Sequence, residues 1–159
     1  MDRPESIVEV LDRYGSYPTT TKGTSMQPLF RTRRDVVILE RPAGEVKKYD
    51  VVLYNAPYGN NIMHRVIKVL PDEYLIRGDN TFTDEHIPKG DIIAVMVSFN
   101  RKGKRYKVSS LSYRIYSVVW TAIYPIRRII FKLRGFILRT GSKIKRRLFV
   151  RPNGEKNER

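Results

Sequence analysis

The spacing of apolar side chains predicts one short helix at the start of the chain. Apolar residues recur three to four positions apart over residues 4–14, which is the spacing of one face of an amphipathic helix. Asp2 and Glu5 stand three apart, like an N-cap residue and its reciprocal partner. Gly15 follows the last apolar position and favours the conformation that ends a helix.

The pattern then changes to short runs rich in Val, Ile and Tyr, separated by Pro, Gly, Asn and Asp. Such runs are typical of β-strands joined by turns. No helical pattern of crossover length interrupts them, so a parallel sheet is not expected. The sequence therefore predicts a mainly β protein, a compact antiparallel fold of about 100 residues. The predicted strands are residues 18–22, 35–40, 49–55, 62–70, 73–77, 91–99 and 104–108.

Charge divides the 159-residue chain into two parts. Residues 1–100 contain 13 basic and 14 acidic side chains, whereas residues 101–159 contain 18 basic and 2 acidic ones. This distribution does not fit a uniformly basic nucleic-acid-binding domain. The chain has no cysteine and two histidines, which excludes disulfides and thiolate catalysis and argues against a histidine-rich metal site. We expect no cofactor and no metal.

The basic part predicts a helical tail after the β domain. Residues 126–137 place apolar side chains at helical spacing among arginines and lysines, which is typical of a basic amphipathic helix. We predict a β domain over residues 1–107, a basic amphipathic helical tail over residues 108–150 and a disordered C-terminus over residues 151–159.

Three interpretations of this tail are open. It docks on the β domain, lies on the anionic inner leaflet of a membrane, or binds nucleic acid. An uncharged run over residues 115–126 places Tyr116, Trp120 and Tyr124 at headgroup level and favours the membrane. The run is shorter than the roughly 20 residues of a spanning helix, and no secretory signal peptide is recognisable. We expect a protein inside the cell, bound peripherally to the inner face of the cell membrane, without nucleic acid as a partner.

The segment with the clearest chemistry is the loop over residues 22–30. Gly23 permits a tight backbone and Pro28 fixes the chain just beyond, so Ser25 is held in a rigid turn. A serine nucleophile needs such a fixed position and a base within hydrogen-bond reach. The alternative is that Ser25 only caps the turn.

The candidate base is His64, in the predicted strand 62–70. A reversal centred between Pro71 and Asp72 would place Asp79 directly opposite His64 on the next strand, where a carboxylate could orient the imidazole. Asp84 is a second carboxylate close by in the sequence. The alternatives are an ordinary half-buried histidine and two aspartates that cap turns.

Several short motifs occur in a recognisable order. They are Gly23-Thr-Ser-Met-Gln-Pro28, Tyr49-Asp-Val-Val-Leu-Tyr54, His64-Arg-Val-Ile67, Arg77-Gly-Asp-Asn80 with Asp84, Ile87-Pro88 and Asp91-Ile-Ile93. This order resembles the type I signal peptidase superfamily, which also contains the self-cleaving LexA-like repressors. The resemblance covers roughly residues 18–98. His64-Arg-Val is similar to the Ser–His branch of archaeal and endoplasmic-reticulum enzymes.

The resemblance implies a serine endopeptidase domain over residues 1–107. It implies Ser25 as nucleophile, His64 as general base, Asp84 as the acid of the triad and Asp79 as its support. The oxyanion would be held by main-chain N–H groups, foremost that of Ser25. Two positions depart from the pattern: Gly23 stands where many members have a serine that donates to the oxyanion, and Ala94 where glycine is usual.

The sequence thus predicts cleavage of a leader or signal peptide from a precursor, through an acyl-enzyme formed by Ser25 and His64. The precursor would be the substrate partner, and the tail would contact the membrane. Two alternatives are kept. One is a LexA-like self-cleaving regulator whose tail binds nucleic acid. The other is a non-catalytic membrane-binding module on a degenerate peptidase fold.

Overall fold

The computed structural model describes residues 5–56 and 59–133, and it begins with the predicted helix. α1 spans Ile7–Tyr14 and ends at Gly15, whose φ of 73° is left-handed. Its capping box is formed by Ser6 and Glu9, each side chain bonding the other's main-chain N–H. The predicted cap at Asp2 and Glu5 is therefore wrong, because the sequence offers the same spacing again four residues later, directly before the apolar face.

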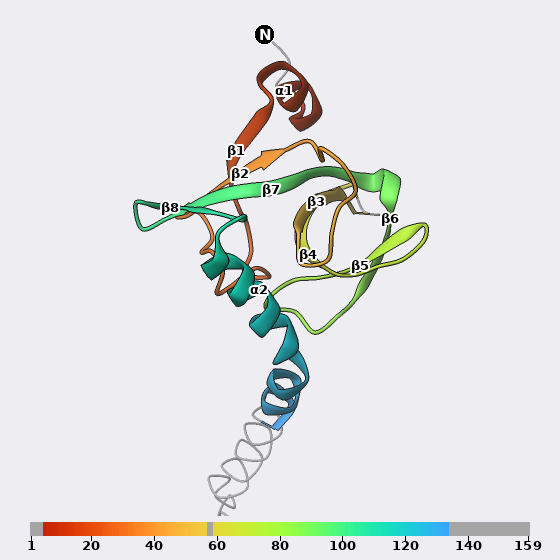
Figure 1. The fold of residues 1–159 in the computed structure, drawn as a ribbon, viewed down its shortest axis with the longest axis vertical. Coiled ribbons are helices and arrows are strands. Elements are labelled where there is room, and N and C mark those ends of the chain that lie inside the picture. The colour runs from red at the N-terminus through yellow and green to blue at the C-terminus, as the bar shows by residue number, and fades with distance from the viewer. Residues whose placement is uncertain (1–4, 57–58, 134–159) are drawn as a thin grey trace, which may run out of the picture. The chain divides into compact units, whose positions relative to one another are not determined.

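Eight antiparallel strands follow in the part of the chain that the structure describes, and every strand predicted from the alternation pattern is among them (Figure 1). The hydrogen-bonded order is β1-β2-β7-β3-β4-β5-β6, and β8 pairs with β7. One strand, β6, was not predicted; it ends in proline, which is uncommon within a strand. The strands are β1 (Ser16–Thr20), β2 (Val36–Glu40), β3 (Val51–Asn55), β4 (Asn61–Val69), β5 (Glu73–Arg77), β6 (Glu85–Pro88), β7 (Ile92–Arg101) and β8 (Lys104–Lys107), with a 3-10 turn, η1 (Lys89–Asp91), before β7.

The β4–β5 register contains an irregularity that matters for the site. Near the turn the strands pair as predicted, with Val69 opposite Tyr74. A bulge between Val66 and Lys68 then shifts the pairing by one position, so Arg65 lies opposite Arg77. A bulge inserts one unpaired residue into a strand, and the sequence pattern does not mark it. Continued by one residue, this register places Gly78, not Asp79, opposite His64, so the predicted pairing is wrong by one position.

The sheet curves so that both faces of β3 are buried, and two apolar clusters result. Val51 and Leu53 belong to the larger cluster, which also contains Leu11 of α1 and Tyr113 of a later helix. Val52 and Tyr54 point the other way, into the smaller cluster. A strand that is buried on both faces is a rigid support for the side chains of its neighbours.

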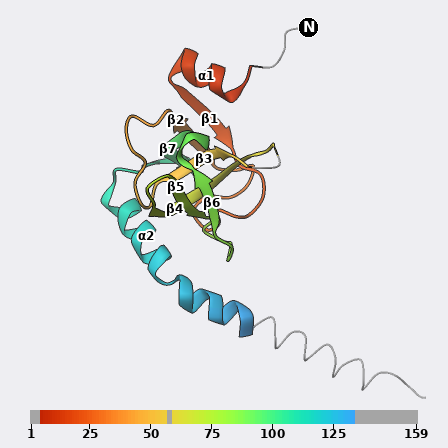
Figure 2. The ribbon, with the colours of Figure 1, turned by 90° about the vertical axis from the view of Figure 1, so that its right-hand side faces the viewer.

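The helix α2 spans Leu111–Ala122 and belongs to the same compact unit as the strands. In both views α1 and α2 lie on opposite sides of the strands (Figures 1 and 2). A second unit begins at Ile123, and its residues 124–133 are helical. The predicted domain boundary at residue 107 therefore precedes a helix that packs with the β-strands. The rest of the predicted tail and the end at 151–159 lie outside the described residues.

The described residues contain no helix that is both long enough and apolar enough to cross a bilayer.

Candidate active site

His64 lies on β4 opposite Val52 and is 6% exposed. Its Nδ1 atom lies 2.9 Å from Oε1 of Glu85 and 3.1 Å from the hydroxyl oxygen of Tyr54. Glu85 is the first residue of β6, and Tyr54 lies on β3, two residues from Val52 and on the same face. Side chains from three strands, β3, β4 and β6, therefore meet at one imidazole nitrogen.

Tyr54 completes a closed triangle with the other two side chains. Its hydroxyl donates to Oε2 of Glu85 over 2.7 Å. Burial and the neighbouring Glu85 raise the pKa of Tyr54, so the phenol keeps its proton and acts as this donor. Glu85 can then accept a second hydrogen bond from Nδ1–H of His64. Because Nδ1 carries the proton in this arrangement, the lone pair of the neutral ring is on Nε2.

Burial lowers the pKa of His64 below its ordinary value, although the charge and hydrogen bond of Glu85 and the charge of Asp79 act in the opposite direction. The net shift leaves the ring neutral at neutral pH. A neutral imidazole with a free Nε2 is the form that a general base requires.

Ser25 lies at the start of the turn after Gly23 and is half-buried. The loop over residues 78–80 holds it in place. The main-chain N–H of Asn80 donates to the carbonyl oxygen of Ser25 over 2.6 Å, and the Asn80 side chain donates to the Thr24 carbonyl over 3.3 Å. Two hydrogen bonds from one residue therefore fix the main chain of the nucleophile loop.

Gly78 sits where the serine loop and His64 come together. A Cβ atom at this position would lie 2.8 Å from the carbonyl oxygen of Ser25 and 2.9 Å from Nε2 of His64. The two atoms are thus no further apart than the sum of these distances, about 5.7 Å. The absence of a side chain at Gly78 is what allows this approach, and it brings Nε2, rather than Nδ1, toward the serine loop.

Ser25 and His64 also line one cavity, with a volume of about 450 Å³. Ile7 of α1, Tyr17 of β1 and Leu53 of β3 contribute to its wall. The cavity opens beside the two candidate catalytic side chains and offers an apolar surface for a ligand side chain. The described residues contain no cluster of three or more potential metal ligands.

The two aspartates expected at the site have other partners. Asp84 forms an ion pair with Arg77. Asp79 is bound by both Nε and Nη2 of Arg65, each over 2.7 Å. The carboxylate that bonds His64 belongs to Glu85, the residue after Asp84.

Sequence reasoning missed Glu85 and Tyr54, and for different reasons. Glu85 follows Asp84 directly, so a short motif does not distinguish the two without knowing that β6 begins there and which side chain faces inward. A signal for Tyr54 was available: alternation places it on the same face of β3 as Val52, the residue opposite His64. The contact between Tyr54 and His64 then depends on the register in which β4 pairs with β3.

No protein-family model matches the chain, and no curated protein is significantly similar to it.

Proposed function

We propose that this protein is a serine endopeptidase with Ser25 as nucleophile, His64 as general base and Glu85 as the acid that orients it. One observation carries the proposal: Nδ1 of a buried histidine is held by a carboxylate, while Nε2 lies beside the loop that carries Ser25. A nucleophile, a base and a group that orients the base are the three parts that acyl transfer to serine needs.

The chemistry follows from these positions. Oγ of Ser25 attacks the carbonyl carbon of a peptide bond, and Nε2 of His64 takes the hydroxyl proton. The negative charge on the carbonyl oxygen is held by the main-chain N–H of Ser25. The C–N bond then breaks, and His64 returns the proton to the leaving amine. Water, deprotonated by the same nitrogen, hydrolyses the acyl-enzyme and frees Ser25.

The substrate class that we propose is a leader or signal peptide on a precursor, cut at the inner face of the cell membrane. The apolar cavity beside Ser25 suits an uncharged side chain next to the cleaved bond. The chain from residue 101 onward contains 18 basic and 2 acidic side chains, which favours contact with an anionic membrane surface.

The direct test works without an identified substrate. The full-length protein is incubated with a peptide library of diverse sequence, and new peptide ends are found by mass spectrometry. We expect cleavage at a restricted set of sites by the wild type and none by Ser25→Ala, with the circular dichroism spectra of the two proteins identical. Equal cleavage by Ser25→Ala, or none by the wild type, would contradict the proposal. The second outcome would favour a non-catalytic binding module.

The pH dependence is a further prediction. Only neutral His64 accepts the serine proton, so kcat/KM on the best-cut peptide falls as pH drops through the pKa of this ring. Since burial lowers that pKa from its ordinary value of 6.5, we expect the acidic limb to have its midpoint below pH 6.5 and the enzyme to be fully active at neutral pH. A midpoint above pH 6.5 would mean that the base is not the buried His64.

A further inference from the structure

The helix α2 buries side chains that carry hydroxyl groups and exposes most of its aliphatic ones. Its most buried side chains are Tyr113 and Ser117, at 8% and 1% exposure. The outward face carries apolar residues that are about half exposed or more. Helices on the surface of soluble proteins normally turn their apolar stripe to the core and their polar face to water. The exposed apolar residues of α2 are Leu111 (72%), Ile115 (54%), Val118 (45%) and Val119 (50%).

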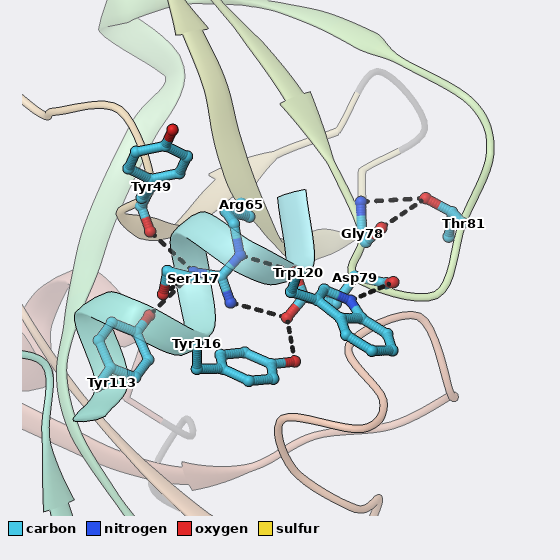
Figure 3. Close-up of polar contacts among 9 residues, drawn as sticks. All are labelled: Tyr49, Arg65, Gly78, Asp79, Thr81, Tyr113, Tyr116, Ser117 and Trp120. Carbon is cyan, nitrogen blue, oxygen red and sulfur yellow. Dashed lines mark hydrogen bonds and ion pairs between the residues drawn. The ribbon is translucent and has the colours of Figure 1, made fainter. Parts of the chain in front are cut away.

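The inner face of α2 binds a buried ion pair (Figure 3) and also contacts the larger apolar cluster, to which Tyr113 belongs. Arg65, which is fully buried, donates through Nη1 to the hydroxyl groups of Tyr113 and Ser117 over 3.2 and 2.9 Å. Its partner Asp79 accepts a hydrogen bond from the Tyr116 hydroxyl over 3.1 Å. Within the described part of the chain, every buried polar side-chain atom has a hydrogen-bond partner, so this network is complete.

One side chain of α2 also bonds the main chain of the loop over residues 78–80. The indole N–H of Trp120 donates to the carbonyl oxygen of Asp79 over 2.9 Å (Figure 3). Asp79 is flanked by Gly78, which abuts Nε2 of His64, and by Asn80, which binds the carbonyl of Ser25. The placement of α2 therefore sets the placement of the loop that separates the nucleophile from the base.

The net charge of the chain around α2 indicates which surface its outer face contacts. From residue 108 to residue 154 the chain has no acidic side chain, and within the second unit the described residues continue the mixture of apolar and basic positions. Ile126 and Ile129 are exposed there beside Arg127 and Arg128. Arg114 is the one charged residue of α2 and is exposed among the apolar side chains of its outer face. A half-exposed apolar face in a strongly cationic segment fits the interface of an anionic bilayer.

We propose that α2 is a membrane-contact helix that couples binding of an anionic lipid surface to the alignment of the peptidase site. Its outer face enters the lipid interface. Tyr116 and Trp120, predicted from the sequence to be at headgroup level, lie instead on the inner face and bond Asp79, so that expectation is wrong for these two residues. They are positioning residues that act through Asp79. Lipid contact stabilises α2 against the strands and with it the arrangement of Ser25 and His64. The effect on catalysis rests on the proposed function, whereas lipid binding by α2 does not.

Binding is tested with full-length Ser25→Ala protein and sedimented vesicles of phosphatidylcholine, with or without one third phosphatidylglycerol. We expect binding to the anionic vesicles, weakened at least tenfold by Ile115→Ser/Val119→Ser. Val8→Ser is the matched control, because Val8 is an exposed helical valine (40%) on α1; it should bind as the parent does. Equal binding by the α2 variant would show that the basic tail binds alone, and no vesicle binding would point to a protein on this face. Either result would overturn the proposal.

Coupling is read from Trp120, the one tryptophan in the chain, and from cleavage of the best-cut library peptide. We expect anionic vesicles to shift the Trp120 emission and to raise kcat severalfold. Tyr116→Phe should bind vesicles as the wild type does but lose most of the rise in kcat. Ile115→Ser/Val119→Ser should keep the activity measured without vesicles. Bound protein with unchanged emission and unchanged kcat would disprove the coupling.

The two proposals fail in distinguishable ways. If the chain is not a peptidase, no peptide is cut, yet vesicle binding and the Trp120 shift persist. If α2 is not a membrane-contact helix, cleavage persists, Ile115→Ser/Val119→Ser binds vesicles no more weakly than its parent, and vesicles leave the emission of Trp120 unchanged.

Discussion

Glu85→Gln lowers kcat on the best-cut library peptide by roughly 10³- to 10⁴-fold, the size expected when the orienting acid of a serine–histidine pair becomes an amide. The carboxylate of Glu85 accepts from Nδ1–H of His64 and from the Tyr54 hydroxyl. An amide can turn its NH₂ group toward Nδ1, which favours the tautomer with the proton on Nε2. That tautomer cannot accept the proton of Ser25, and the imidazolium formed during catalysis loses its counter-charge.

The matched control is Asp84→Asn, at the adjacent position that the sequence motif indicates as the acid. Asp84 pairs with Arg77 at the surface, so this variant should keep kcat within about threefold, as expected for a side chain that contacts no reacting group. The acidic side of the pH profile of kcat/KM gives a second readout. Glu85 raises the pKa of His64, so Glu85→Gln moves the limb to lower pH. A large loss of kcat in Asp84→Asn with normal activity in Glu85→Gln would reverse the assignment.

The second large effect concerns stability rather than catalysis. Arg65→Met should lower the free energy of unfolding by about 3–5 kcal/mol, because it leaves the carboxylate of Asp79 buried without its cation. The Arg65 side chain is fully buried and that of Asp79 is 2% exposed. Methionine fills much of the volume of the arginine stem, so the loss reports the missing charge and hydrogen bonds more than a cavity.

Urea denaturation followed by circular dichroism measures this loss, and a double-mutant cycle isolates its cause. Asp79→Asn alone should destabilise strongly as well, whereas Arg65→Met/Asp79→Asn should lose about 2 kcal/mol less than the sum of the two single losses. Asp84→Asn removes one member of a partly exposed pair and should cost about 1 kcal/mol or less. Additive losses in the cycle would show that Arg65 and Asp79 contribute independently and that the pair does not anchor the loop.

The pattern of side chains along the chain predicted α1 and every described strand except β6. Alternating Val, Ile and Tyr runs between turn residues place seven of the eight strands in the described residues, and Gly15 ends α1 as expected. These features are local: they depend on the period of burial and on backbone preferences that each residue carries with it. The same locality explains why Ser25, in its Gly- and Pro-bounded turn, stands out from the sequence alone.

The partners of each functional group were decided by the tertiary structure. One unpaired residue near Ile67 shifts the β4–β5 register, which puts Gly78 opposite His64 and directs Asp79 to Arg65. Glu85 and Tyr54 reach the imidazole from β6 and β3. Because the side-chain period of a strand is two, an error of one residue turns every later side chain to the opposite face. Local pattern specifies which residues alternate, but only the folded sheet fixes which of them meet.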